Sequence, residues 1–354
     1  MKIALINDTH CGVRNNNQMF AEYQGRFYSE IFFPYLDKHN IKDIIHLGDY
    51  FDRRRDVNFY SLYKNREHFV EPMIDRNITM DLIVGNHDIY FKSTNELNSP
   101  DYLLDFENIN VYKDPIVKNY DGLDICLLPW INSENYEDVE EFLDICSAHI
   151  VMCHGEINGA MMQPGHFQGG GTISTQMFKR FEQVYSGHYH HKSELDNIRF
   201  LGSQMEFTWA DFGDDKHFHI LDTETREIEA IHNPLKMFHK VFYDDTNETL
   251  MTIKKKEFNE LKDAFVKVIV VNKNEPYWFD VFIENIIKAG PADLKVVEDH
   301  SNLDVLDEDD LATEAEDTLT ILTKHIDSLN IDGDKKKLDA LMRSLYTESL
   351  DILV

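Results

Sequence analysis

Five short polar phrases, each following an apolar run, are the feature that most limits how this chain can fold. In order they are Asp8-Thr9-His10, Gly48-Asp49-Tyr50-Phe51-Asp52, Gly85-Asn86-His87-Asp88, His154-Gly155 and Gly187-His188-Tyr189-His190. Open α/β sheets gather their ligand-binding groups where parallel strands end. The sequence therefore predicts an α/β fold in which several strand ends carry one polar site.

The apolar segments between these phrases support that fold class. Strands are predicted at residues 3–7, 44–47, 78–84, 123–128, 149–153, 183–185, 198–201 and 218–221. Their apolar and β-branched runs lack clean alternation, which indicates strands that are buried on both faces. Helical spacing of apolar residues predicts helices over Met19–Tyr35 and Phe59–Asp75, with Pro34 marking a kink or an end of the first.

The length of 354 residues exceeds what one hydrophobic core usually serves. A composition change near His232-Asn233-Pro234 divides a main domain (1–232) from a small α+β capping domain (233–300), with strands at 266–271 and 294–297 around a helix at 278–289. Residues 301–317 are strongly acidic and predict a solvated linker. Residues 318–354 outline two short amphipathic helices, which we expect to dock on a partner.

The formal net charge of −29 repels phosphate backbones at long range, so tight nucleic-acid binding by the whole surface is not expected. Solubility is an alternative role for most of these charges. Bound metal ions or a local basic patch can still reverse the potential at one site. Four cysteines without CxxC spacing, no signal peptide and no apolar run of about 18 residues predict a cytoplasmic protein without a membrane span.

The residue types in the five phrases suit a two-metal hydrolase. Such a site needs oxygen and imidazole ligands around two ions roughly 3.5–4 Å apart, with one carboxylate shared between them. Seven groups are available: Asp8, His10, Asp49, Asn86, His154, His188 and His190. Because no thiolate is among them, Mn²⁺ is favoured, with Fe²⁺ or Zn²⁺ possible and Mg²⁺ less suited.

Each phrase taken alone has a simpler interpretation. Gly85 and Asn86 could adopt positive φ in a turn, with His87 capping a helix. His188, His190 and His191 could form a surface cluster. All five phrases follow predicted strands, however, and this shared position favours a metal site.

The phrases resemble the DxH, GDxxD, GNHD/E, H and GHxH motifs of the calcineurin-like metallophosphoesterase family. The resemblance implies a four-layer α/β/β/α sandwich that binds two Mn²⁺ ions per chain, which lower the pKa of the attacking water. Its motifs place Asp8, His10 and His190 on one metal, Asp49 between the metals, and Asn86, His154 and His188 on the other. His87 would face the scissile phosphate as a general acid or as a stabilising cation, with Asp52 and Asp88 supporting the ligands.

Within that family the layout resembles the SbcD-type DNA repair nuclease branch, most closely the recombination endonuclease subunit of T-even-like phages. The segment 153–159 and the phrase Phe200-Leu201-Gly202-Ser203, with Trp209 downstream, carry this likeness. It implies an exonuclease and endonuclease subunit that processes double-strand breaks in the cytoplasm, or in the host cytoplasm for a phage protein. It further implies a homodimer, a capping domain that assists DNA binding, and a C-terminal helical pair that binds an SMC-like ATPase.

Several points stay open in the sequence. Asp52 stands where many members of this branch carry a histidine that positions DNA, so cleavage polarity is not implied. Arg53, Arg54 and Arg55 could clamp backbone phosphates or pair with Asp52 and Asp56. A phosphoprotein phosphatase or small-phosphodiester hydrolase is an alternative function, because residues 48–53 are close to the phosphatase motif GDxVDRG. A dimeric scaffold for the ATPase, with weak catalysis, is a second alternative.

Overall fold

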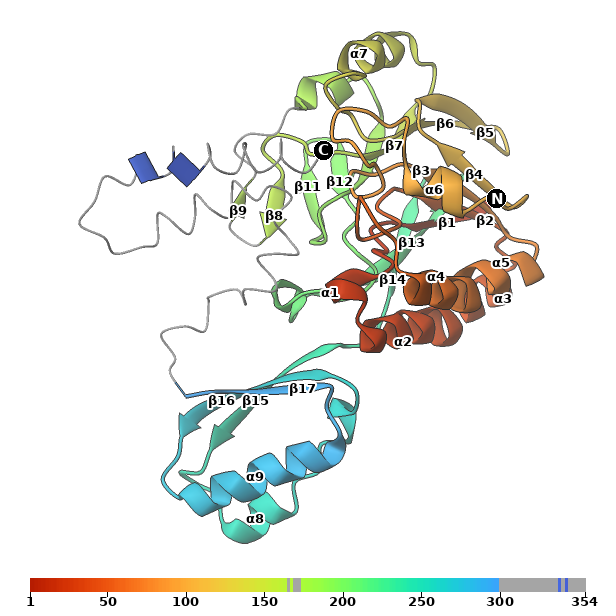
Figure 1. Cartoon of the computed structure of the whole chain (residues 1–354). Helices are drawn as coiled ribbons and strands as arrows, with labels where there is room; N and C mark the ends of the chain where they lie inside the picture. Colours follow the sequence, from red (N-terminus) through yellow and green to blue (C-terminus); the bar gives the residue numbers. More distant parts are fainter. Residues whose placement is uncertain (164–165, 168–172, 299–336, 339–340, 343–354) are drawn as a thin grey trace. The chain divides into compact units, whose positions relative to one another are not determined.

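The computed structural model describes residues 1–163, 166–167, 173–298, 337–338 and 341–342 (Figure 1). Residues 1–207 and 211–298 form one compact unit. The predicted acidic linker (301–317) lies outside the described residues, as does the predicted helical pair (318–354) apart from four residues.

Two six-stranded sheets form the larger part of this unit. The first has the order β14 (Ile228–His232), β13 (His217–Asp222), β1 (Lys2–Ile6), β2 (Asp43–His46), β3 (Thr79–Ile83), β4 (Ile109–Tyr112). The second has the order β11 (Ser193–Leu195), β12 (Ile198–Phe200), β10 (Gln183–Gly187), β7 (Ile150–His154), β6 (Leu123–Leu128), β5 (Ile116–Tyr120). Strands β1 to β4 pair in parallel, as do β6, β7, β10 and β12.

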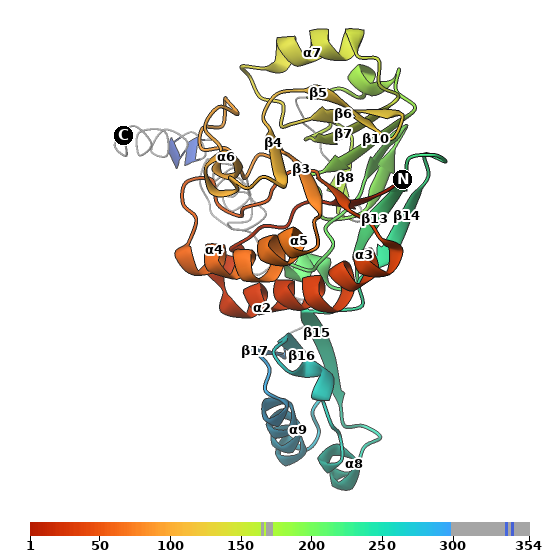
Figure 2. The same ribbon diagram turned by 90° about the vertical axis from the view of Figure 1, so that its right-hand side faces the viewer.

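The two sheets pack face to face between helices, which confirms the four-layer α/β/β/α class (Figure 2). Leu5 and Ile45 of the first sheet share a buried apolar cluster with Ile125 and Met152 of the second. The first sheet's outer face is covered by α2 (Gln18–Arg26), α3 (Phe33–His39), α4 (Phe59–Asn65) and α5 (Glu71–Asp75). Helix α7 (Tyr136–Ile145) covers the second sheet, while α1 (Val13–Asn16), α6 (Ser99–Leu103) and the β8–β9 hairpin (Met161–Gln163, His166–Phe167) lie in the connections.

Pro34 does not end the first long helix, and the helix runs on to His39. A π-helical segment, Phe27–Phe32, joins α2 to α3, and the Phe33 N–H bonds to the Tyr28 carbonyl five residues back. Proline cannot donate a hydrogen bond, so a wider turn absorbs the missing donor without breaking the helix. Pro72 follows a second π-helical segment, Arg66–Val70, between α4 and α5 in the same way.

A smaller sheet carries the C-terminal part of the described chain. Its strands β15 (Phe238–Asp244), β16 (Phe265–Asn272) and β17 (Asp293–Val297) pair in parallel. Helices α8 (Leu250–Lys254) and α9 (Pro276–Ala289) pack on one face of this sheet. The sequence patterns missed β15 and α8. None of the described helices is both long and apolar enough to cross a membrane.

Candidate metal centre

The five polar phrases meet where the carboxyl ends of the two sheets come together. Asp8, Asp49 and Asn86 follow β1, β2 and β3 of the first sheet. His154 ends β7 of the second sheet, and His188 follows β10. Parallel pairing within each sheet brings these strand ends to one edge, as the sequence predicts.

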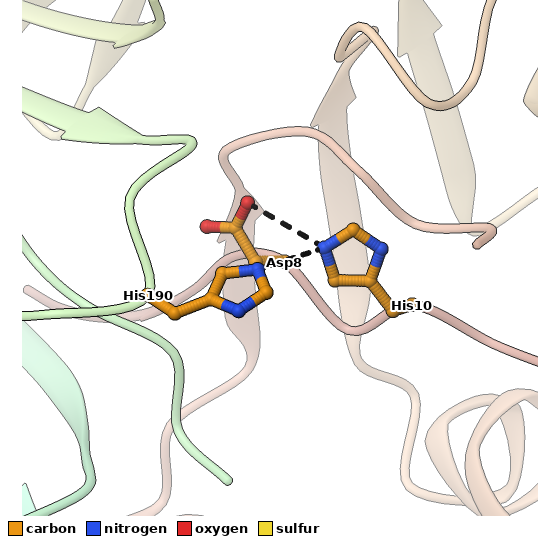
Figure 3. A group of neighbouring side chains, drawn as sticks. All are labelled: Asp8, His10 and His190. Carbon is orange, nitrogen blue, oxygen red and sulfur yellow. Dashed lines mark hydrogen bonds and ion pairs between the residues drawn. The ribbon is translucent and has the colours of Figure 1, made fainter. Parts of the chain in front are cut away.

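Asp8, His10 and His190 form a first group of converging donor atoms (Figure 3). Nε2 of His10 lies 3.0 Å from Nε2 of His190 and 4.0 Å from the Asp8 carboxylate. The two rings belong to phrases 180 residues apart in the chain. His191, by contrast, lies 3.3 Å from Asp214 and belongs to neither of the candidate groups that contain His188 and His190.

Asp49, Asn86, His154 and His188 form a second group. Nε2 of His154 is 2.9 Å from the Asn86 side-chain oxygen and 3.2 Å from the Asp49 carboxylate. Nδ1 of His188 is 3.0 Å from the same Asn86 oxygen. Asp49 also lies 3.9 Å from His10 of the first group, so its carboxylate stands between the two groups.

These separations fit metal coordination. Two donor atoms bound at about 2.1 Å to one ion, and at right angles, lie about 3 Å apart. A hydrogen bond also orients the His154 ring for metal binding. The Nδ1–H of His154 donates to the Leu47 carbonyl at 2.7 Å, which leaves Nε2 as the ring atom that can bind a metal ion. Three candidate groups thus gather at this edge: Asp8, His10, His190; Asp49, His154, His188; and His10, Asp49, His87.

Close backbone packing makes glycine necessary at the ends of these strands. A Cβ atom built on Gly85 would lie 2.3 Å from the Asp49 nitrogen and carboxylate, and one on Gly187 would lie 2.6 Å from the Leu47 carbonyl. The Asp88 N–H bonds to the Gly85 carbonyl at 3.3 Å and closes a turn, but Gly85 and Asn86 are not among the residues with positive φ, so the expected positive φ is wrong. Gly85 allows two strand ends to approach each other.

The histidines set the charge of the central carboxylate. Burial alone would raise the pKa of Asp49, but the neighbouring His154 and His87 rings bring that pKa well below its usual range. Burial opposes protonation of His154, and Asp49 nevertheless raises the pKa of this ring to about 10. Burial, His87 and His190 hold the pKa of His10 well below its usual value. An ionised carboxylate surrounded by imidazoles is an environment that attracts divalent cations.

His87 lies at the rim of this centre. Its backbone N–H donates to Asp49 at 2.8 Å, and its Nδ1–H donates to the Asp52 carbonyl at 2.6 Å. The ring stands edge-on to His10 at a centroid distance of 4.8 Å. The Nδ1–H contact fixes the tautomer of the neutral ring, so Nε2 is the nitrogen that can exchange a proton with a substrate.

Asp88 and Asp52 lie directly behind these residues. One Asp88 oxygen accepts the N–H groups of Tyr50 and Phe51, both at 3.0 Å, and the other accepts the Gly85 N–H at 2.9 Å. Burial and nearby Asp49 raise the pKa of Asp88 to about 7. Asp52 lies 3.5 Å from Nδ1 of His10, and burial raises its pKa.

Arg53, Arg54 and Arg55 follow the Asp49 loop on the surface. Arg53 donates to the Asn15 side chain and lies 3.5 Å from Asp56. Arg54 and Arg55 line a pocket of about 270 Å³ between this loop and α6. The structure therefore contains one of the ion pairs of the alternative interpretation.

Three residues beside the centre were missed by sequence reasoning. Asn7 donates to the Asp8 carboxylate and to the Gly202 carbonyl. The Trp130 ring lies 5.3 Å from His188, and buried Lys216 donates to the His190 carbonyl at 2.9 Å. Asn7 and Trp130 also follow strand ends, so extending the strand-end criterion to every parallel strand would have found them. Lys216 carries no such signal.

Comparison with known proteins decides the family. The family model described as calcineurin-like phosphoesterase matches residues 1–333. The chain belongs to the calcineurin-like phosphoesterase family. It is therefore a metallophosphoesterase, and this family uses divalent metal ions. The five polar phrases and the candidate metal groups lie within the matched region.

Two relatives of this metallophosphoesterase are subunits of larger nucleases by name. The chain is 30% identical over 354 residues to Exonuclease subunit 1 of Enterobacteria phage T4, and the match covers 99% of both chains. It is 19% identical over 214 residues to a subunit of nuclease SbcCD from Staphylococcus saprophyticus, covering 58% of this chain and 54% of the relative. Among solved structures, a dimetal phosphatase from Danio rerio has a TM-score of 0.40 at 9% identity, covering 67% of this chain and 97% of that one.

Proposed function

We propose that this metallophosphoesterase is the metal-dependent DNA nuclease subunit of a complex that processes double-strand breaks for repair and recombination. The observation that carries the proposal is the convergence of two donor groups on one shared carboxylate, Asp49. Two divalent ions there would lower the pKa of a water and neutralise charge on the phosphate. We expect both ions to be Mn²⁺, because imidazole and hard oxygen donors are mixed.

The protein's own groups would divide the remaining work. Asp8, His10 and His190 would hold one ion, and Asn86, His154 and His188 the other, with Asp49 shared. His87 would act from the rim, where its Nε2 donates a proton or a hydrogen bond to the phosphodiester. Asp88 would hold the Asp49 and Gly85 loops in register.

His87→Ala tests this division of labour. Because His87 is assigned to the substrate, the variant should lose cleavage while retaining both metal ions. His188→Ala should lose cleavage and one ion. Metal analysis of the two purified variants, beside their nuclease rates with Mn²⁺, checks the assignment, and loss of metal from His87→Ala would contradict it.

The choice of DNA is supported by the full-length likeness to a phage exonuclease subunit. The competing function is dephosphorylation of proteins or small phosphodiesters, which the same centre could perform. Linear duplex DNA and a phosphopeptide, each supplied with Mn²⁺, separate the two. We expect cleavage of DNA, and turnover of the phosphopeptide alone would overturn the choice.

We further propose that residues 318–354 bind an SMC-like ATPase. The names of both relatives describe subunits, and the acidic stretch before this segment suits a tether. Deleting residues 318–354 should abolish association with the ATPase and spare Mn²⁺-dependent cleavage of single-stranded DNA. An ATPase that still binds would refute the docking assignment. If the full-length chain binds the ATPase but cleaves nothing, the scaffold alternative is correct.

A homodimer is the assembly we propose for this subunit. Large aromatic side chains are exposed on α4 and α6, with Phe59 88%, Tyr63 59% and Tyr102 70% exposed. Aromatic residues are enriched at protein interfaces, and we place the dimer interface at these two helices. A Phe59→Asp/Tyr102→Asp variant should elute as a monomer in light-scattering chromatography, whereas a wild-type monomer would contradict the assembly. We place the complex in the cytoplasm, in keeping with four free, buried cysteines.

A further inference from the structure

The Phe207 ring packs on both imidazoles of the first candidate metal group, which Figure 3 shows facing each other. It stands edge-on to His10 at a centroid distance of 5.7 Å and to His190 at 5.6 Å, with interplanar angles of 78° and 66°. The Phe207 side chain is fully buried. Edge-on aromatic contacts at these distances are attractive and depend on orientation. Phe207 therefore restricts the rotation of both imidazoles.

The Trp130 ring takes the corresponding place in the second group. It lies 5.9 Å from the His154 ring and 5.3 Å from the His188 ring. Trp130 is partly exposed, in contrast to Phe207. Among the described residues, neither of these aromatic rings contacts an imidazole of the other group. Each group of ligands thus has an aromatic support of its own.

Hydrogen bonds tie Phe207 to the backbone of His190. The Phe207 N–H donates to the Asp211 carboxylate at 2.9 Å, and the same carboxylate accepts from buried Lys216. The Lys216 ammonium also donates to the His190 carbonyl at 2.9 Å. One network therefore fixes both the Phe207 ring and an imidazole that it contacts.

Trp130 is tied in a similar way to another ligand of the second group. Its N–H donates to the Val84 carbonyl at 2.8 Å, and its carbonyl accepts from the side chains of Asn95 at 2.9 Å and Asn135 at 3.0 Å. Val84 lies two residues before Asn86, whose side-chain oxygen is 2.9 and 3.0 Å from the ring nitrogens of the two histidines in this group. The Trp130 ring is therefore held beside the ligands that it contacts.

The two groups differ in what else orients their imidazoles. Nδ1 of His154 donates to the Leu47 carbonyl at 2.7 Å, so a hydrogen bond fixes this ring in addition to Trp130. Nδ1 of His10 is buried and makes no hydrogen bond within the described part of the chain, with the Asp52 carboxylate 3.5 Å away. Metal-binding histidines are usually oriented by a hydrogen bond to the second ring nitrogen. The orientation of His10 therefore depends more strongly on ring packing.

We propose that Phe207 and Trp130 are positioning residues, one for each metal ion, an inference that rests on the proposed two-metal function. A phenyl ring has no atom that binds a metal ion, and the indole N–H can only donate. Each ring instead holds two imidazoles in place, so that an ion does not have to order them when it binds. The affinity for each ion is set by a separate ring, and Phe207 has the larger effect.

Replacing each ring in a chain that keeps one ion tests this inference. His188→Ala leaves the first group as the intact site, and His190→Ala leaves the second. Isothermal titration with Mn²⁺ then measures the Kd of one ion at a known site. We expect Phe207→Leu to weaken binding about ten- to hundredfold in the His188→Ala chain, the usual effect of residues that orient metal ligands. The same change should have no effect in the His190→Ala chain, because the two sites are independent.

Trp130→Leu should have the reverse pattern and a smaller effect. We expect binding to weaken about two- to tenfold in the His190→Ala chain, the range that one aromatic contact contributes, and to be unchanged in the His188→Ala chain. Trp130→Phe keeps a ring and should restore most of the affinity. Because Trp130 is partly exposed, its replacement tests the inference independently of the stability of the buried Phe207 position.

Phe218→Leu and Trp278→Leu are matched controls in the same chains. Phe218 is a fully buried ring that packs on Phe27 and Phe32, and Trp278 is a partly exposed indole on α9. Among the described residues, neither control ring contacts an imidazole of the candidate centre. Both controls should keep the Mn²⁺ affinity of the parent chain, although urea unfolding should show similar losses of stability in Phe218→Leu and Phe207→Leu.

Unchanged Mn²⁺ affinity in Phe207→Leu, equal weakening in Phe207→Leu and Phe218→Leu, or the same weakening at both ions would overturn the inference. These results in a wild-type background that binds two Mn²⁺ ions would leave the proposed function intact. A wild-type chain that binds fewer than two Mn²⁺ ions would overturn the proposed two-metal function as well.

Discussion

The candidate metal centre and the β15–β17 sheet place buried carboxylates in opposite situations. Beside this sheet, Asp245 accepts hydrogen bonds from the backbone and side chain of Asn274, the Glu275 N–H and the Tyr243 hydroxyl. At the centre, Asp49 accepts the His87 N–H and otherwise faces imidazole rings. A carboxylate saturated by donors stabilises a fold, whereas one facing other ligand groups can bind a cation.

Asp49→Asn should give the largest contrast between these regions. The variant loses the charge that both metal groups share, so we expect hydrolysis of bis(p-nitrophenyl) phosphate with Mn²⁺ to fall about ten-thousandfold or more, roughly 5.5 kcal/mol. Asp245→Asn, its control, should bind two ions and keep most of this activity. A comparable loss of hydrolysis in both variants would contradict the different roles assigned to the two carboxylates.

Lys216→Ala should have the next largest effect, a decrease in the free energy of unfolding. Lys216 is buried between Asp211 and Asp214, and its removal takes the cation away from the buried, charged Asp211, which costs about 3–5 kcal/mol. Lys273→Ala beside β16 removes a largely exposed pair with Glu298 and a contact of the ammonium with the Phe279 ring, and should cost about 1–2 kcal/mol. Urea unfolding of both variants measures the difference. If both variants have the same free energy of unfolding, the buried ion pair contributes no more to stability than the exposed pair.

The buried His219 should make the free energy of unfolding depend on pH. Burial, Lys192 and His217 lower the pKa of His219 to about 3, and neither ring nitrogen has a hydrogen-bond partner in the described part of the chain. As the pH falls below about 6.5 the unfolded chain takes up this proton first, so the folded state loses about 2 kcal/mol of stability by pH 5. His219→Leu should remove that part of the pH dependence of urea unfolding, and His239→Leu in the half-buried capping strand should remove less. An unchanged slope in His219→Leu would contradict the assignment.

Replacing Arg53, Arg54 and Arg55 together with alanine should have the smallest effect. If they clamp phosphates, DNA cleavage should fall about tenfold more than hydrolysis of bis(p-nitrophenyl) phosphate, close to 1.4 kcal/mol. Equal losses on the two substrates would support the ion-pair interpretation instead, in which Arg53 pairs with Asp56.

The candidate site could be anticipated from the sequence because its residues sit at strand ends. Asp8, Asn86 and His188 each follow a buried strand, and parallel pairing alone brings such ends together. The supports of the site could not be anticipated in this way. The need for glycine at position 85 comes from the approach of Asp49, and Lys216 reaches His190 from a separate strand-flanking loop.

Several features of the fold could not be predicted from the sequence patterns either. Strand β15 mixes His239 and Lys240 with apolar residues, so its pattern does not resemble a buried strand. The alignment of Lys240, Lys267 and Lys295 depends on the register between three strands, which no local pattern contains. The helix through Pro34 continues because a π-helical segment absorbs the missing donor.

Anomalous diffraction from crystals grown with Mn²⁺ tests the central claim most directly. Two peaks roughly 3.5–4 Å apart are expected, one bound by Asp8, His10 and His190, the other by Asn86, His154 and His188, with Asp49 contacting both. A single peak, or peaks that do not share Asp49, would contradict the two-metal account.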